Sequence, residues 1–435
     1  MMSKNILLYS IVFLLSFFFS CQGKKTPGNE SLAIQVQQQS KVKGFLHKDG
    51  RMLFPIGFYE LPRNDAQLQR YVQSGVNLFR CSGKVDLDRV AAVGAMGWVP
   101  LNWAMGATEA LREQVAAVVD HPALAVWEGP DEIVHSFTRG SALYRKLHVY
   151  KFSDAWVRQT PNAIAYSEKK AQEIMPAMHK AIDMIRRMDS HNRPLWINEA
   201  TNSDLKFVRQ YIDAIDITGC DTYPVKENKR DVAVVGPITD RWVKVGRNQK
   251  AVWMVLQAFS WNELGDYFGA KKFAYPSFIE SRFMAYDAII HGAGGLLYWG
   301  SHYTKNQAFR QSLLALTAEL AALQPFLVAP DQPVHVELVE CVRKIKDHGV
   351  QVMARRHGDD WIVALVNEDR RPHLGVEVTG LGELNGHDLQ LLYGNEKSCV
   401  ERGELITRLT PLQVKIFATN RKWQSRPMDG RDFQE

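Results

Sequence analysis

Three carboxylates stand close together in the segment "AVWEGPDEI", residues 125–133. They are Glu128, Asp131 and Glu132, and they follow an apolar run that is typical of a buried strand. Neighbouring carboxylates raise one another's pKa because their charges repel, and proteins use such groups as proton donors and acceptors. The alternative for Glu132 and Asp131 is a role as a loop or helix N-cap carboxylate. For Glu128 it is an ion pair with an arginine such as Arg80. If the segment is an active site, a partner group must come from another part of the chain.

Eight short apolar runs, each followed by an amphipathic segment, extend over the first three quarters of the chain. Their apolar residues are nearly continuous rather than alternating, which is typical of parallel strands that are covered on both faces. The runs are 52–60, 76–83, 98–105, 123–132, 194–200, 215–224, 251–259 and 295–303. This pattern predicts an α/β fold, a (β/α)8 TIM barrel over residues 44–330. An open doubly wound sheet is the alternative, but no glycine-rich phosphate loop follows the first run.

The pattern changes after residue 330. Short runs of alternating apolar and polar residues, separated by turn residues, fill residues 331–420. Such alternation is typical of antiparallel strands with one face in a core, so we expect a small all-β sandwich domain there. Residues 421–435 are polar and are expected to form a tail.

In a (β/α)8 barrel the active site lies at the carboxyl ends of the strands. Those ends are rich here in carboxylates, amides and aromatic rings, which suits carbohydrate chemistry. Asp221, at the end of the sixth run, is a candidate catalytic partner of Glu132 and Asp131. The expected substrate-binding residues are Tyr59, Arg80, Asn102, Trp103, Glu128, Glu199, Tyr223, Gln257, Trp299 and His302. The sequence has no serine nucleophile motif and no convincing metal-ligand spacing, so we expect no cofactor and no metal.

Several short motifs resemble those of the (β/α)8-barrel glycoside hydrolases of the large clan A superfamily. They are "DGRMLFPIGFYE" at the first strand, "GVNLFR" at the second, the carboxylates after the fourth, and "YW" in the eighth. The resemblance implies hydrolysis of O-glycosidic bonds in an oligo- or polysaccharide, with Glu132 as the general acid/base. Asp131 takes the place of the asparagine that usually holds the substrate's 2-hydroxyl. A neighbouring anion raises the pKa of a glutamic acid, which favours its use as a general acid.

The chain departs from this family at strand seven, where Gln257 stands in place of the usual glutamate nucleophile. Three hypotheses follow. Another carboxylate, Asp221, Glu199 or Glu263, is the partner of Glu132. Alternatively, Asp131 and Glu132 work as in the similar Asp-Glu pair of barrel N-acetylhexosaminidases, where the substrate's acetamido group is the nucleophile. In the third hypothesis the barrel binds glycan without cleaving it.

The N-terminus has one early lysine, then an apolar run that ends at Ser20-Cys21. This pattern resembles a bacterial lipoprotein signal, which implies a signal peptide over residues 1–21 and a lipid on Cys21. Plain secretion and an uncleaved anchor are the alternatives. Residues 22–43 are polar and are expected to form a tether. The expected location is therefore the bacterial cell envelope, on the periplasmic side or at the cell surface.

Charge and cysteine content add two expectations. The formal net charge of +6 is spread along the chain without a long basic run, so we expect no nucleic-acid partner. The expected partners are a carbohydrate substrate and, through the lipid anchor, a membrane. Cys341 and Cys399 are candidates for a disulfide in an oxidising compartment, with free thiols as the alternative.

Overall fold

The computed structural model describes residues 43–141, 152–265, 272–340, 343–346 and 349–426. The predicted signal peptide, Cys21, most of the tether, Cys341 and most of the tail lie outside these ranges. Within them, Cys81 and Cys220 are buried free thiols, and Cys399 is a free thiol at the surface. None of the helices in the described ranges combines the length and the apolar character that crossing a bilayer requires.

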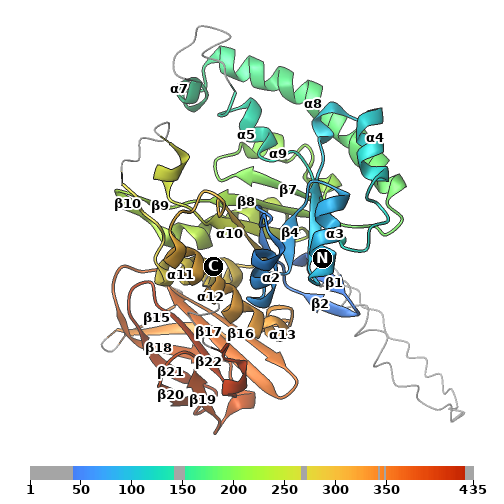
Figure 1. Cartoon of the computed structure of the whole chain (residues 1–435). Helices are drawn as coiled ribbons and strands as arrows, with labels where there is room; N and C mark the ends of the chain where they lie inside the picture. Colours follow the sequence, from blue (N-terminus) through green and yellow to red (C-terminus); the bar gives the residue numbers. More distant parts are fainter. Residues whose placement is uncertain (1–42, 142–151, 266–271, 341–342, 347–348, 427–435) are drawn as a thin grey trace, which may run out of the picture. The chain divides into compact units, whose positions relative to one another are not determined.

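The predicted (β/α)8 barrel is confirmed. Eight parallel strands close in the order β11-β12-β3-β4-β5-β6-β7-β8. Figure 1 labels β4, β7 and β8 among them, near the centre of the molecule. In chain order they are β3 (Ile56–Phe58), β4 (Leu78–Arg80), β5 (Met96–Pro100), β6 (Leu124–Glu128), β7 (Leu195–Ala200), β8 (Ile217–Thr222), β11 (Ala251–Gln257) and β12 (Gly295–Trp299). Each of the eight predicted runs contains one of these strands or overlaps it.

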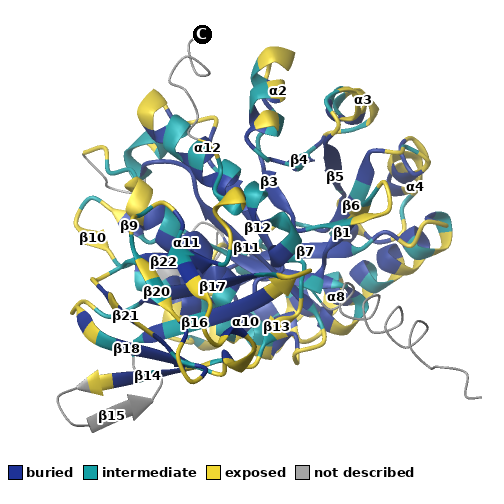
Figure 2. Ribbon diagram, turned by 90° about the horizontal axis from the view of Figure 1, so that it is seen from below, coloured by how far each residue is buried: buried dark blue, intermediate teal, exposed yellow. Residues whose placement is uncertain are grey.

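Helices connect the strands and cover the outside of the barrel. They are α2 (Asp65–Gln73), α3 (Lys84–Ala92), α4 (Glu109–Ala116), α5 (Ile133–Phe137), α7 (Phe152–Val157), α8 (Pro161–Met188), α9 (Leu205–Val208), α10 (Val235–Val245), α11 (Phe278–Ile290), α12 (Gln307–Ala322) and α13 (Gln324–Leu327). Figure 2 shows buried strands in the centre, and the exposed residues of α2, α3 and α4 lie on their outward faces. This is the amphipathic pattern that the sequence predicts. Two short hairpins, β1 (Leu46–Lys48) with β2 (Arg51–Leu53) and β9 (Val225–Lys226) with β10 (Lys229–Arg230), lie outside the barrel sheet.

Large aromatic side chains fill the interior of the barrel. Trp196 lies between Trp98 and Trp253, with ring centroids 5.9 and 5.3 Å apart, and all three are fully buried. Gly295, opposite Trp253 on the neighbouring strand, makes room for this ring, because a Cβ there would lie 2.6 Å from it. The interior is therefore a packed core, and polar chemistry is confined to the strand ends.

The third strand differs from its prediction in position. The sequence run 98–105 suggested a strand that ends near Trp103, whereas β5 ends at Pro100 and Trp103 begins a 3-10 turn, η1 (Trp103–Met105). The apolar run continues past the strand because this turn also packs into the core, where Trp103 is fully buried.

Two antiparallel sheets follow the barrel, as predicted. One has six strands in the order β13-β16-β17-β22-β19-β20, and the other has four in the order β15-β14-β18-β21. Their bounds are β13 (Asp331–Gln332), β14 (His335–Glu340), β15 (Arg343–Lys346), β16 (Val350–His357), β17 (Asp360–Asn367), β18 (His373–Thr379), β19 (Asp388–Leu391), β20 (Lys397–Cys399), β21 (Leu405–Leu409) and β22 (Val414–Ala418).

The inner strand β17 of the six-stranded sheet is buried on both faces. Along β17, Val363 and Leu365 belong to the core shared with the four-stranded sheet. Ile362, Ala364 and Val366 belong instead to the core that includes the barrel helices. Successive residues of a strand point to opposite faces, so β17 joins the sandwich to the outside of the barrel.

Candidate active site

The backbone after β6 is fixed by the neighbouring strand β7. The amide of Gly129 donates to the carbonyl of Trp196 at 2.7 Å, and the amide of Glu132 donates to the carbonyl of Asn198 at 2.9 Å. Glu132 has φ 50° and ψ 39°, the left-handed region that is uncommon for residues other than glycine. Strained conformations of this kind persist where the surroundings over-determine them, and they concentrate at functional sites.

Glu132 and Asp221 share a hydrogen bond between their carboxyl groups. Burial raises the pKa of Asp221 well above its usual range, and the charge of Glu132 and this hydrogen bond raise it further. Two carboxylates cannot both remain ionised at hydrogen-bond distance. Asp221 is therefore the protonated donor, and Glu132 accepts.

Tyr223 connects this pair to a cluster of aromatic rings. Its hydroxyl forms a hydrogen bond with Asp221, which opposes the rise in the pKa of the carboxyl. Its ring stacks on Trp299, with centroids 5.4 Å apart and planes at 23°. Phe259 packs edge-on against both rings, at 5.1 and 5.0 Å. Tyr223 and Trp299 keep part of their surface in contact with solvent, so an aromatic surface lies directly beside the two carboxyl groups.

Asp131 lies next to the pair and reaches the solvent. Its Oδ1 accepts a hydrogen bond from Asn198 Nδ2 at 2.9 Å. The surrounding protein and the charge of Glu128 raise the pKa of Asp131 to about 7, although the side chain retains solvent contact. The buried Oδ1 of Asn198 has no hydrogen-bond partner among the described residues. The sequence predicts that Asn198 lies at the end of the fifth strand, but no sequence pattern indicates a function for this residue.

Glu128 lies deeper and is fully buried. Its Oε2 accepts hydrogen bonds from Arg80 Nε at 2.8 Å and from Trp98 Nε1 at 3.1 Å. Burial raises the pKa of Glu128, and the Arg80 guanidinium opposes that rise. The Tyr59 ring packs against Trp98 at 5.4 Å, and Arg80 lies over it at 5.8 Å. Burial raises the pKa of Tyr59 well above its usual range, and the nearby charges of Asp131 and Glu128 raise it further.

Gln257 has an internal role in place of the predicted contact with substrate. Its side chain is fully buried. It accepts from the amide of Val225 at 2.9 Å, and it donates to the carbonyls of Val225 and Phe259 at 2.9 and 3.0 Å. The amide thus fixes the loops after β8 and β11, and both of its polar atoms are hydrogen-bonded within the protein.

Glu199 is also buried and internally bonded, so it is not a substrate-binding residue in this structure. Its carboxylate accepts from the amide of Val134 at 3.1 Å, the hydroxyl of Tyr211 at 2.8 Å and the hydroxyl of Ser203 at 2.6 Å. Burial raises the pKa of Glu199 to about 7. The residue supports the start of α5, which directly follows Glu132.

The remaining predicted residues lie further from the pair or in the core. Glu263 caps the turn η4 (Trp261–Leu264), and its carboxylate accepts a hydrogen bond from Tyr275 Oη at 2.5 Å. These contacts engage the carboxylate in the loop, so it is a poor candidate for the nucleophile. Trp103 is fully buried, whereas Asn102 is exposed. His302 is exposed, and its Nδ1 lies 3.2 Å from Glu60 Oε1. That Asn102 and His302 contact the substrate remains a prediction.

The chain was compared with protein families, curated proteins and solved structures. No family model and no curated protein matches the chain. Solved structures do match, among them a β-galactosidase from Bacillus circulans sp. alkalophilus, with a TM-score of 0.51 and 8% identity over 84% of this chain and 99% of that one. A GH42 β-galactosidase from G. stearothermophilus gives 0.49 and 10% over 84% and 98%. A GH27 β-L-arabinopyranosidase from Geobacillus stearothermophilus gives 0.48 and 11% over 84% and 96%. The fold of this chain is therefore similar to that of the Bacillus circulans β-galactosidase.

Proposed function

We propose that the protein is a glycoside hydrolase whose catalytic pair is Glu132 and Asp221. The observation that carries the proposal is the hydrogen bond between these carboxyl groups beside the stacked rings of Tyr223 and Trp299. Most glycoside hydrolases use one protonated and one ionised carboxyl group, which flank the scissile bond. Flat aromatic rings supply the apolar surface on which a sugar ring packs, and their position is consistent with a substrate next to the pair.

The two carboxyl groups take different roles because their protonation differs. Asp221 holds the proton and gives it to the leaving-group oxygen as the glycosidic bond breaks. Glu132, ionised, attacks the anomeric carbon and forms a glycosyl ester, which water then hydrolyses while Asp221 takes up a proton. This assignment reverses the role that the family resemblance implied for Glu132.

The spacing of the pair favours retention of configuration. Carboxyl groups that share a hydrogen bond lie nearer to the roughly 5–5.5 Å separation of retaining enzymes than to the roughly 6.5–9.5 Å of inverting ones. A retaining mechanism thus needs the smaller movement of side chains when substrate enters between them.

The test is hydrolysis of a panel of aryl glycosides and polysaccharides by wild type, Glu132→Gln and Asp221→Asn. Both substitutions keep the shape of the side chain and remove its acid–base chemistry, so each is expected to lower kcat/KM by roughly 100-fold to 10,000-fold. Glu113→Gln, the same change on the exposed face of α4, is the control and is expected to match wild type. Wild-type activity that both variants retain contradicts the proposal.

The same panel of substrates also tests two other functions. Substrate assistance by Asp131 and Glu132 predicts activity only on N-acetylated sugars and its loss in Asp131→Asn. A glycan-binding barrel predicts that wild type binds one polysaccharide and cleaves none. The shared hydrogen bond of Glu132 and Asp221 favours hydrolysis, because it pairs a proton donor with a carboxylate, which acid–base catalysis needs and glycan binding alone does not.

The proposed location is the bacterial cell envelope, with a lipid on Cys21. The support is the sequence pattern before that residue. Partition of the expressed protein into detergent, with Cys21→Ala as the comparison, tests it. Wild type is expected in the detergent phase and Cys21→Ala in the aqueous phase, and identical partition contradicts the lipid anchor.

A further inference from the structure

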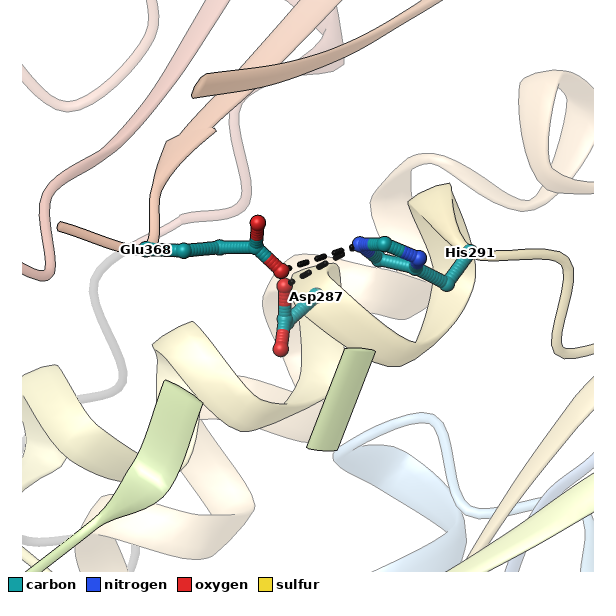
Figure 3. A group of neighbouring side chains, drawn as sticks. All are labelled: Asp287, His291 and Glu368. Atoms are coloured by element: carbon teal, nitrogen blue, oxygen red, sulfur yellow. Dashed lines mark hydrogen bonds and ion pairs between the residues drawn. The ribbon is translucent and has the colours of Figure 1, made fainter. Parts of the chain in front are cut away.

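A second group of ionisable side chains lies between the barrel and the six-stranded sheet. Asp287 is in the last turn of α11, His291 follows at the end of the same helix, and Glu368 follows β17 directly. Figure 3 shows the three side chains pointing toward one another from these two parts of the chain. One ligand atom from each residue lies within 4.8 Å of the other two.

This group is separate from the Glu132–Asp221 pair. Helix α11 runs from the end of β11 back to the start of β12, so its last turn lies near the amino ends of the barrel strands. The carboxyl ends carry the proposed active site. The amino-terminal end of a (β/α)8 barrel is associated with stability rather than with catalysis.

The ligand atoms are spaced as a small cation requires. His291 Nε2 lies 3.1 Å from Glu368 Oε1 and 3.8 Å from Asp287 Oδ1. Bonds of about 2.0–2.2 Å from Zn²⁺ to nitrogen and oxygen put tetrahedral ligand atoms roughly 3.3 Å apart. The present distances bracket that value, so binding needs only small movements of the side chains.

The other polar atom of each side chain is held by a separate partner. Asp240 Oδ1 accepts from His291 Nδ1 at 3.0 Å. Asp287 Oδ2 accepts from the Gly236 amide at 2.6 Å, and Glu368 Oε2 accepts from Gln351 Nε2 at 3.1 Å. Metal-bound histidines almost always donate their other ring nitrogen in this way, and such outer partners orient the ligands.

An independent observation points to a bound cation. Asp287 is fully buried, and its Oδ1 faces the group, where its one hydrogen-bond partner among the described residues is the carboxyl group of Glu368, a proposed co-ligand. A cation between these two buried carboxyl groups would be held by both of them. Gly236 keeps the space around the group open, since a Cβ there would lie 2.6 Å from His291 Nε2 and 2.7 Å from Glu368 Oε1.

We propose that Asp287, His291 and Glu368 bind one divalent transition-metal cation of the Zn²⁺ class, which joins α11 to the six-stranded sheet. One imidazole nitrogen and two carboxylate oxygens favour Zn²⁺ over Mg²⁺ or Ca²⁺, which prefer oxygen ligands alone. Three protein ligands leave a further position for water. The cation clamps the sandwich onto the barrel and takes no part in the proposed hydrolysis.

The experiment measures metal content and thermal stability of the full chain after treatment with a chelator and addition of ZnCl₂. Wild type is expected to take up one Zn²⁺ per chain by elemental analysis, with a rise in Tm that MgCl₂ does not reproduce. Co²⁺ in its place is expected to give the visible absorption of a low-symmetry nitrogen–oxygen site. Wild type without stoichiometric Zn²⁺, or with an unchanged Tm, overturns the proposal.

Two variants and a matched control locate the ion. Glu368→Gln keeps the side chain's size and is expected to bind Zn²⁺ at least 100-fold more weakly. Asp240→Asn leaves all three ligands and is expected to cost about 10- to 100-fold, so it decides the matter if Glu368→Gln does not fold. Asp88→Asn, which alters a two-residue Asp–His pair with His121 at 3.0 Å elsewhere on the barrel, is expected to match wild type. Equal affinity in Glu368→Gln or in Asp240→Asn places the ion elsewhere and overturns the proposal.

Discussion

Glu132 and Asp221 come from strands that are not neighbours, yet their carboxyl groups share a hydrogen bond. Glu132 follows β6 and Asp221 lies near the end of β8, with β7 between them in the barrel. The left-handed conformation of Glu132 accompanies this approach, and the amide contact with Asn198 on β7 holds it. The strained backbone at Glu132 and the high pKa of Asp221 therefore meet in one small region, as expected of an active site.

Removal of the Asp131 charge should change the pH dependence of activity. The charge of Asp131 contributes to the raised pKa of Asp221. The general acid works only while it holds its proton, so kcat/KM falls as the pH rises through the pKa of the pair. Asp131→Asn lowers that pKa, and the alkaline limb of the pH profile is expected to move to lower pH. A limb that stays in place or moves upward contradicts this electrostatic account.

Arg80 should be required for stability because Glu128 is buried beside it. The guanidinium is the partner of a carboxylate with no solvent contact. Arg80→Met leaves that group without its cation and is expected to lower the free energy of unfolding by roughly 3 kcal/mol. In Arg80→Met/Glu128→Gln the charge is gone and the Trp98 hydrogen bond can persist, so most of the loss should be recovered. Urea denaturation measures both variants, and additive losses in the double variant argue against the pairing.

The backbone at Glu132 should favour glycine. A left-handed conformation costs a residue with a Cβ about 1–2 kcal/mol, whereas glycine adopts it freely. Glycine also makes the unfolded chain more flexible, which offsets part of the stability gained by removing the strain. Glu132→Gly is expected to be inactive on glycosides, with a free energy of unfolding that is unchanged or up to about 1 kcal/mol higher. Glu132→Ala removes the same carboxylate and keeps the strain, so it serves as the comparison. A glycine variant that is less stable than the alanine variant refutes the strain argument.

Glu199 should make stability depend on pH. Its folded-state pKa of about 7 lies above the ordinary value of 4.5. The protonated form is therefore favoured on folding, and its stabilising effect is complete below about pH 4.5 and is lost as the pH rises toward and through 7. The full shift corresponds to about 3 kcal/mol. In Glu199→Gln the amide nitrogen can donate to Ser203, and this pH dependence should be absent. Equal slopes of unfolding free energy against pH in both proteins would falsify the assignment.

The sequence predicts the barrel well because its eight apolar runs are long enough to be buried on both faces. It predicts that Asp221 and Glu132 lie close together, because the carboxyl ends of barrel strands converge. It misplaces Gln257 and Glu199, since the hydrogen bonds that consume them come from Val225, Phe259 and Ser203, and no residue pattern reports such contacts.

The cation site shows the same limit. Asp287 and His291 are four residues apart in "DAIIH", a spacing that places both on one face of a helix. Glu368 is 77 residues further along the chain from His291, and only the packing of β17 against α11 brings it to them. Ligand spacing within a segment could have suggested two of the three residues, whereas the third depends on the tertiary structure.

The stereochemistry of azide products tests the catalytic pair most directly. Azide enters the space of a removed carboxyl group and attacks the anomeric carbon from that side. On a glycoside that the wild type cleaves, Glu132→Gly with azide is predicted to yield a glycosyl azide of inverted configuration. Asp221→Gly is predicted to yield one of retained configuration, because azide then opens the glycosyl ester on Glu132. The opposite configurations, or no azide product from either variant, would contradict the assignment of Glu132 as nucleophile and Asp221 as acid/base.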